Sequence, residues 1–115
     1  MQNDTSPKPK GLADAQVAKI AELANYQDGA IVSREIIRKP NGSVTIFAFA
    51  EGQGLSEHTV PFDAIAQVVE GAVEIMISGK PHHLQSGEII RMPAGQPHAV
   101  KALGRFKMIL TKIRA

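Results

Sequence analysis

From residue 30 onward the chain is a series of short β-forming runs, each separated from the next by a turn sequence. The intervening PNGS, EGQG, SGKP, QSGE and PAGQP are rich in Gly, Pro, Asn and Ser, which favour turns. At least seven strands in succession, with no helical pattern between them, predict an all-β fold: an antiparallel sandwich or closed barrel rather than a βαβ sheet. The runs are IVSREII (31–37), VTIFAFA (44–50), AQVVEGAVEIMI (66–77), HHL (82–84), EIIRM (88–92), HAVKA (98–102) and FKMILTKI (106–113).

Two of the turns are predicted to close tight hairpins. In KPNGS and SGK, Asn41, Gly42 and Gly79 tolerate the positive φ that short hairpin connections require. The last run alternates so that Phe106 and Met108 share one face, which predicts a final strand with that face packed inward.

The N-terminal third differs from this pattern. Residues 1–11 carry too little apolar surface to offset the entropy of ordering, so they are predicted to form a flexible tail. Asp14 is predicted to cap a short helix that ends near Gly29, because Val17, Ile20 and Ala24 follow the spacing of one buried helical face. Residues 12–115 are then predicted to form a single domain around one core.

Composition excludes several classes of function. The chain has no cysteine, which rules out disulfides, thiolate metal sites and cysteine nucleophiles. Its 13 Lys and Arg against 11 Asp and Glu are scattered, so no nucleic-acid partner is expected. The polar N-terminus lacks the apolar core of a signal peptide and no segment is long enough to span a bilayer, so we expect a cytoplasmic protein with no membrane partner.

Two spaced motifs make the sequence resemble the cupin superfamily, specifically its small single-domain, RmlC-like members with a conserved jelly-roll β-barrel. The family's first motif, Gly-x5-His-x-His-x3,4-Glu-x6-Gly, is similar to the stretch from Gly52 through His58 to Gly71. Its second motif, Gly-x5-Pro-x-Gly-x2-His-x3-Asn, is similar to the stretch from Gly87 through His98 to residue 102. The resemblance implies a jelly-roll barrel with one short N-terminal helix.

The metal-binding half of these motifs is incomplete. Val60 stands at the second His, Ala64 at the Glu and Ala102 at the Asn, so only His58 and His98 remain of the positions that would hold an ion. A divalent cation needs at least three protein ligands for secure binding. A bound Fe, Mn, Ni or Zn would therefore require a third ligand.

Other polar side chains near the motifs are candidates for that third ligand. Of His82 and His83, one could face inward, and Asp63 and Gln67 adjoin motif positions; Gln67 is a poor metal ligand but a good partner for a polar ligand. Small and apolar replacements should instead enlarge and dry the pocket, which favours an apolar or mixed small molecule. The expected pocket residues are His58, Val60, Ala64, Ala66, Gln67, His98 and Ala102.

These observations leave three functions open. The first is a barrel that binds a small molecule between His58 and His98; the second is a metal-dependent dioxygenase or isomerase with a non-standard site. The third is a structural or regulatory barrel whose apolar residues fill the pocket. A homodimer is also expected, through an outer sheet surface assigned to Ile31, Ile37, Ile75, Ile89 and Ile109.

Overall fold

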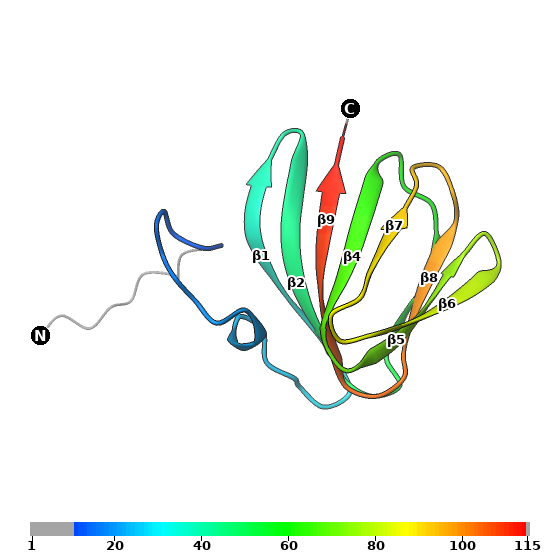
Figure 1. The fold of residues 1–115 in the computed structure, drawn as a ribbon, viewed down its shortest axis with the longest axis horizontal. Helices are drawn as coiled ribbons and strands as arrows, with labels where there is room; N and C mark the ends of the chain where they lie inside the picture. The colour runs from blue at the N-terminus through cyan, green and yellow to red at the C-terminus, as the bar shows by residue number, and fades with distance from the viewer. Residues whose placement is uncertain (1–10, 115) are drawn as a thin grey trace, which may run out of the picture.

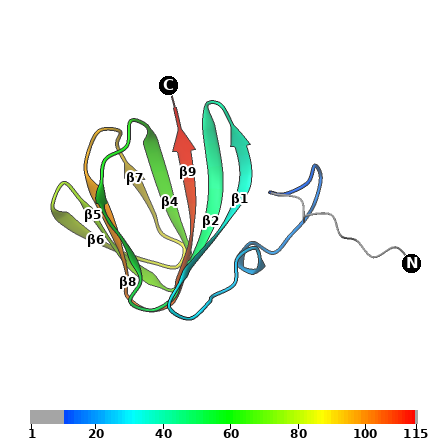
Figure 2. The same cartoon turned by 180° about the vertical axis from the view of Figure 1, so that it is seen from behind.

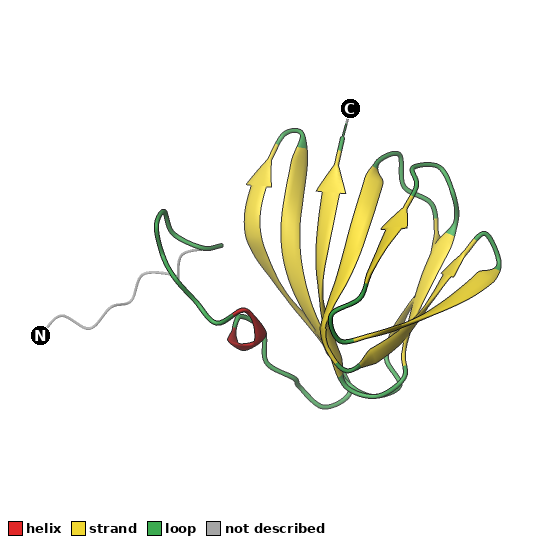
Figure 3. Cartoon of the chain, viewed as in Figure 1, coloured by secondary structure: helices red, strands yellow, loops and turns green. Residues whose placement is uncertain are grey.

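Two antiparallel sheets make up the protein, in a computed structural model that describes residues 11–114. The tail predicted for residues 1–11 lies, apart from Gly11, outside the described residues. In chain order the elements are a single 3-10 turn η1 (Ile20–Glu22) and the strands β1 (Ile31–Lys39), β2 (Gly42–Phe49), β3 (Gly54–His58), β4 (Asp63–Glu70), β5 (Ala72–Ile77), β6 (Lys80–Gln85), β7 (Ile89–Met92), β8 (His98–Ala102) and β9 (Phe106–Ile113). The all-β prediction is confirmed (Figure 3).

The sheets have the orders β1-β2-β9-β4-β7 and β3-β8-β5-β6. In Figure 1 they lie close together at the lower end and diverge toward the upper end, where the chain leaves β9. Every pairing within them is antiparallel. The register places Gly42, Ile113 and Asp63 side by side, so the β1–β2 turn, the end of β9 and the start of β4 share one end of the barrel.

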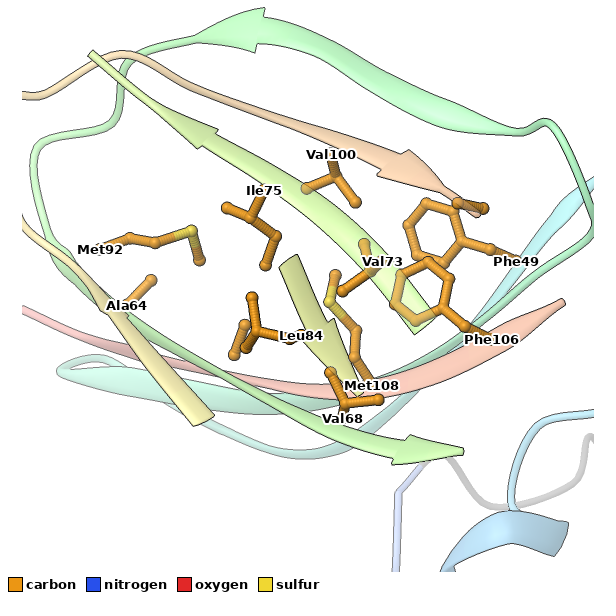
Figure 4. Close-up of a cluster of buried hydrophobic side chains, with 12 residues drawn as sticks. Phe49, Ala64, Val68, Val73, Ile75, Leu84, Met92, Val100, Phe106 and Met108 are labelled. Carbon is orange, nitrogen blue, oxygen red and sulfur yellow. The ribbon is translucent and has the colours of Figure 1, made fainter. Parts of the chain in front are cut away.

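The main core lies between the two sheets and follows the two-residue alternation of the strands (Figure 4). Phe49 and Phe106 stack at one end, with ring centroids 4.5 Å apart. Ala64 and Met92 lie at the opposite end of the same cluster (Figure 4). The predicted inward face of the last strand is confirmed, because Phe106 and Met108 are fully buried.

A second, smaller cluster covers the outer face of the five-stranded sheet. Ile46 and Ala48 alternate with the core-facing phenylalanines of β2 and pack against Ala24, Leu23 and Tyr26 of the N-terminal segment. Figures 1 and 2 show this segment on the side of the large sheet away from β5, β6 and β8.

The predicted N-terminal helix is wrong, since only η1 forms in residues 11–30. Ala15 has a positive φ of 60°, which interrupts a right-handed helix, and Val17 is 95% exposed instead of buried. A helix of the predicted length, from Asp14 to near Gly29, is only marginally stable on its own. The segment instead gains its stability by laying Leu23, Ala24 and Tyr26 across the sheet.

Two features of the strand pattern also differ from expectation. The run at 66–77 is two strands, β4 and β5, separated at Gly71. Strand β3 was missed because Leu55 is the only large apolar side chain in GLSEH. Both hairpins are present, but of the three residues predicted to need positive φ only Gly79 has it, at 79°.

The surface assigned to five isoleucines is partly wrong. Ile75 is fully buried and Ile31 packs against the main core, so neither belongs to an outer surface. Ile37 is half exposed and Ile89 is more than half exposed, whereas Ile109 packs under the N-terminal segment. The homodimer remains a prediction.

Within residues 11–114 no helix has the length and apolarity to cross a membrane.

Gly71 allows a direct test of why β4 and β5 separate there. Its φ is 81°, and a Cβ at this position would lie 2.2 Å from the Arg105 carbonyl oxygen. Gly79 has nearly the same φ, 79°, with open space around it. Gly79→Ala should therefore cost only the left-handed penalty of about 1–2 kcal/mol, while Gly71→Ala should cost that plus about 1–3 kcal/mol of overpacking. Equal free energies of unfolding for the two variants in urea would contradict this reading.

Lys107 ties the N-terminal segment to the sheet. Its ammonium group is buried, donates to the Ala21 carbonyl and lies 4.7 Å from the centre of the Tyr26 ring. The Tyr26 hydroxyl donates to Glu70 at 2.6 Å, and burial raises the pKa of Tyr26 far above its usual value.

Replacing Lys107 should loosen this attachment. Lys107→Met removes the donor to a part-buried carbonyl and should lower the free energy of unfolding by about 1–3 kcal/mol, whereas Lys101→Met, at an exposed position of β8, should leave it nearly unchanged. Urea unfolding measures both. An undiminished stability in Lys107→Met would show that the attachment contributes nothing.

Candidate functional site

Two histidines meet where β3 ends and β8 begins. His58 and His98 are register partners across this pair of strands, after an irregularity in pairing between Leu55 and His58. Their ring centroids lie 4.4 Å apart with the planes inclined at 61°, an edge-to-face contact. The two imidazoles singled out from the sequence are therefore in direct contact.

The two rings have different surroundings. His58 is exposed, and its Nδ1 donates to the Ser56 carbonyl at 2.9 Å, which leaves Nε2 free to accept a hydrogen bond when the ring is neutral. His98 is only 7% exposed, and its Nδ1 is buried without a hydrogen-bond partner among the described residues. An unpaired buried nitrogen is costly, so its retention calls for an explanation.

Burial lowers the pKa of His98 below the ordinary value of 6.5, and the neighbouring His58 adds to the effect. The Gln96 backbone acts in the opposite direction but more weakly than burial and His58, and Lys112 adds a further lowering of the pKa. The His98 ring is therefore neutral at pH 7, with one ring nitrogen carrying a proton and the other able to accept one.

A cavity of about 100 Å³ adjoins the two rings. Its polar groups are His58, His98 and Lys112, and the rest of its wall is mainly apolar. The apolar wall comes from both sheets and includes Phe47, Leu55, Val60, Ala64, Met92 and Val100. Ala64 and Met92 place it at the end of the core opposite the Phe49–Phe106 stack (Figure 4).

The structure brings together some of the predicted pocket residues and not others. His58, Val60, Ala64 and His98 line the cavity. Ala66 and Ala102 are buried in the main core and do not line it. Gln67 is exposed and pairs with Ile89 and Ile109, so its assignment to the pocket is wrong: it alternates with the inward Ala66 and Val68 and faces outward.

Sequence reasoning missed two side chains of this site. Lys112 lies two positions beyond Leu110 and shares the inward face of β9, so the alternation that identified Phe106 and Met108 could have revealed it. Phe62 precedes β4 in a bend, where strand alternation gives no direction. Its ring lies 5.3 Å from the Lys112 ammonium.

Comparison with known proteins shows which family this chain is similar to. The cupin domain profile matches residues 45–112, the segment that carries both histidines. The chain belongs to the cupin superfamily. No curated protein matches it.

Several solved structures are similar over most of the chain. A conserved protein of unknown function from Streptococcus pyogenes has 26% identity and a TM-score of 0.87, with 97% of this chain and 98% of that chain covered. A cupin superfamily protein from Desulfitobacterium hafniense has 23% identity and a TM-score of 0.86, covering 92% and 97%. A cupin 2 conserved barrel domain protein from Leptotrichia buccalis has 39% identity and a TM-score of 0.79; the match covers 82% of this chain but only 46% of that one.

The residues of this cupin do not fit a metal ion. Among residues 11–114, no group of three His, Asp or Glu side chains is placed to hold one. The candidate third ligands are engaged elsewhere: His83 Nε2 lies 2.8 Å from Glu74, and Asp63 accepts from the Ala94 amide and lies 3.6 Å from Arg91. His82 lies on β6 beside the Ile75 carbonyl, and Gln67 faces outward.

A larger hollow of about 780 Å³ lies elsewhere, between the N-terminal segment and β1 of the cupin barrel. Its main polar side chains already have partners: Tyr26 donates to Glu70, Arg34 donates to the Gly11 carbonyl, and Glu35 accepts from Arg38. The histidine cavity, with an unpaired buried nitrogen, is therefore the better candidate for a binding site.

The lowered pKa of His98 predicts a dependence of stability on pH. The unfolded chain takes up a proton at this residue near pH 6.5, whereas the folded protein does so only at a lower pH. The contribution of neutral His98 is thus fully present above pH 6.5 and is lost as the pH falls below it. His98→Leu should flatten the fall in unfolding free energy between pH 7.5 and 5, measured in urea.

The exposed His83, which pairs with Glu74, provides the control. His83→Gln should leave the contribution of His98 in place. If His98→Leu follows the same pH profile as the wild-type protein, the neutral, buried state assigned to His98 is incorrect.

Proposed function

We propose that this cupin binds a small molecule in the cavity beside His58 and His98, without a bound metal ion. The observation that carries the proposal is a mainly apolar cavity whose polar lining consists of two touching imidazoles and the Lys112 side chain. A mainly apolar wall with a few convergent polar groups is the usual composition of a ligand site.

The two imidazoles offer complementary hydrogen-bonding capacity. His58 Nε2 is an acceptor, because Nδ1 is committed to Ser56. His98 is neutral and has one ring nitrogen without a partner. A hydroxyl or carbonyl group on the ligand would meet a donor or acceptor here, while its apolar part contacts Val60, Ala64 and Met92.

Size restricts what can enter. The cavity of about 100 Å³ is well below the range of about 300–1,000 Å³ that encloses drug-sized ligands. It therefore accommodates a small branched group of a few atoms and not a whole large metabolite.

A metal-dependent dioxygenase or isomerase is the second candidate function, and the donor set argues against it. Two imidazoles without a third ligand hold a divalent cation weakly. Val60 and Ala64 line the cavity at the motif positions of a His and a Glu. Their aliphatic side chains add apolar surface to the wall and cannot ligate a metal ion.

Methionine-methyl NMR with isobutanol as the probe tests the proposal. The chain has four methionines, of which Met92 and Met108 line the cavity while Met76 does not. Isobutanol should shift the methyl signals of Met92 and Met108 and leave Met76 unchanged. Ala64→Leu, which fills the cavity with three further carbon atoms, should abolish the shifts.

Ala99→Leu is the matched control, because Ala99 lies beside His98 on β8 but does not line the cavity. It should retain the isobutanol shifts. Shifts that persist in Ala64→Leu, or that affect Met76 equally, would show that isobutanol binds elsewhere and would contradict the proposal.

A further inference from the structure

A groove of about 530 Å³ opens at the end of the barrel where the β1–β2 turn, the end of β9 and the approach to β4 meet. Its lining is dominated by positively charged side chains, and no Asp or Glu is among its lining residues. We call it the cationic groove; its lining includes Arg38, Lys39, Lys112 and Arg114, together with Ser43 and the ring of Phe62.

The nearby carboxylates do not neutralise these charges. Glu35 pairs with Arg38 at 2.7 Å, which accounts for one of the four. Asp63 is occupied by the Ala94 amide and Arg91. Within residues 11–114, Lys39, Lys112 and Arg114 form no ion pair. Like charges gathered in one hollow repel each other, and a bound anion would relieve that repulsion.

The groove is held in place by backbone and ring contacts. The Arg114 amide donates to the Asn41 carbonyl at 2.7 Å, which joins the end of β9 to the β1–β2 turn. The Phe62 ring is flanked by the Lys112 ammonium at 5.3 Å and the Arg114 guanidinium at 5.4 Å. These contacts keep two of the charged groups on one surface of the groove.

The cationic groove and the histidine cavity are neighbours. Phe62 and Lys112 line both of them, so the two spaces share part of their walls. The cavity admits only a few atoms, which leaves the remainder of any larger ligand outside it. The groove is the adjoining space into which that remainder would extend.

We infer that the ligand carries a phosphate group, bound in the cationic groove while its small apolar part occupies the cavity. This rests on the function proposed above and specifies its ligand class: a phosphate monoester of a short, branched alcohol. The Arg114 guanidinium, which is in no ion pair among the described residues, can bind a phosphate through two parallel hydrogen bonds, and Lys39 and Lys112 add compact charges. A dianion matches this excess of positive charge better than a single carboxylate does.

Amide NMR at constant ionic strength tests the groove, with inorganic phosphate as the probe. Phosphate should shift the amide signals of Gly42, Ser43 and Arg114. The double variant Lys39→Gln/Arg114→Gln, whose residues line the groove but not the cavity, should weaken phosphate binding by roughly tenfold or more. Acetate that binds as tightly as phosphate would overturn the assignment to phosphate.

Lys80→Gln/Lys101→Gln removes the same amount of charge from exposed positions outside the groove. It should leave phosphate affinity unchanged. An equal loss in both double variants would mean that phosphate responds only to overall charge, and the groove would not be a specific site.

Isobutyl phosphate and its homologue with two more methylenes, 4-methylpentyl phosphate, test the link between groove and cavity. At least one of the two esters should bind the wild-type protein more tightly than inorganic phosphate does. In Ala64→Leu, where the cavity is filled, that ester should bind no more tightly than inorganic phosphate. If neither alkyl group adds affinity, the inference of one ligand spanning both spaces fails. The two proposals can fail separately. If the wild-type protein does not bind phosphate but isobutanol still shifts the methionine signals, including in Lys39→Gln/Arg114→Gln, the groove is refuted and the cavity site is retained.

Discussion

The packing of the two sheets against each other across one apolar layer sets where the histidine cavity lies. Along β2 and β9 each strand supplies alternate side chains to that layer and to the outer face. The Phe49–Phe106 stack fills one end of the layer, while small side chains such as Ala64 leave unfilled space at the other. The histidine cavity is therefore a consequence of how side-chain volume is distributed along the core.

That distribution changes the chemistry available to a cupin barrel. With Val60 and Ala64 in place of potential ligands, the cavity wall gains apolar surface, and His98 is held neutral by burial. His58 remains exposed at the same site, with Ser56 fixing the orientation of its ring. The site has two hydrogen-bonding imidazoles and, among residues 11–114, no third side chain placed to hold an ion with them.

The fold was largely predictable because turn residues and strand alternation act locally. Gly52, Gly71, Gly87 and Gly95, the four motif glycines, all have φ between 80° and 89°, which explains why their spacing is informative. The N-terminal helix was mispredicted because the spacing of Val17, Ile20 and Ala24 is only a local signal. The sheet surface that captures Leu23 and Tyr26 comes from distant parts of the chain.

The site was predictable only in part, for a similar reason. The spacing of the two motifs pointed to His58 and His98, and strand alternation could have added Lys112. It could not show that Ala66 and Ala102 lie deeper in the core than the cavity, because depth depends on how far the two sheets diverge. Nor could it bring Arg38 and Arg114 together, since they meet only through the pairing of β1, β2 and β9.

The metal content of protein purified without chelators or a metal-affinity column tests the central claim most directly. An organic ligand site built on two imidazoles predicts far less than one equivalent of Fe, Mn, Ni or Zn per chain, with no difference between the wild-type protein and His58→Ala. One equivalent of any of these metals in the wild-type protein, lost in His58→Ala, would contradict the account.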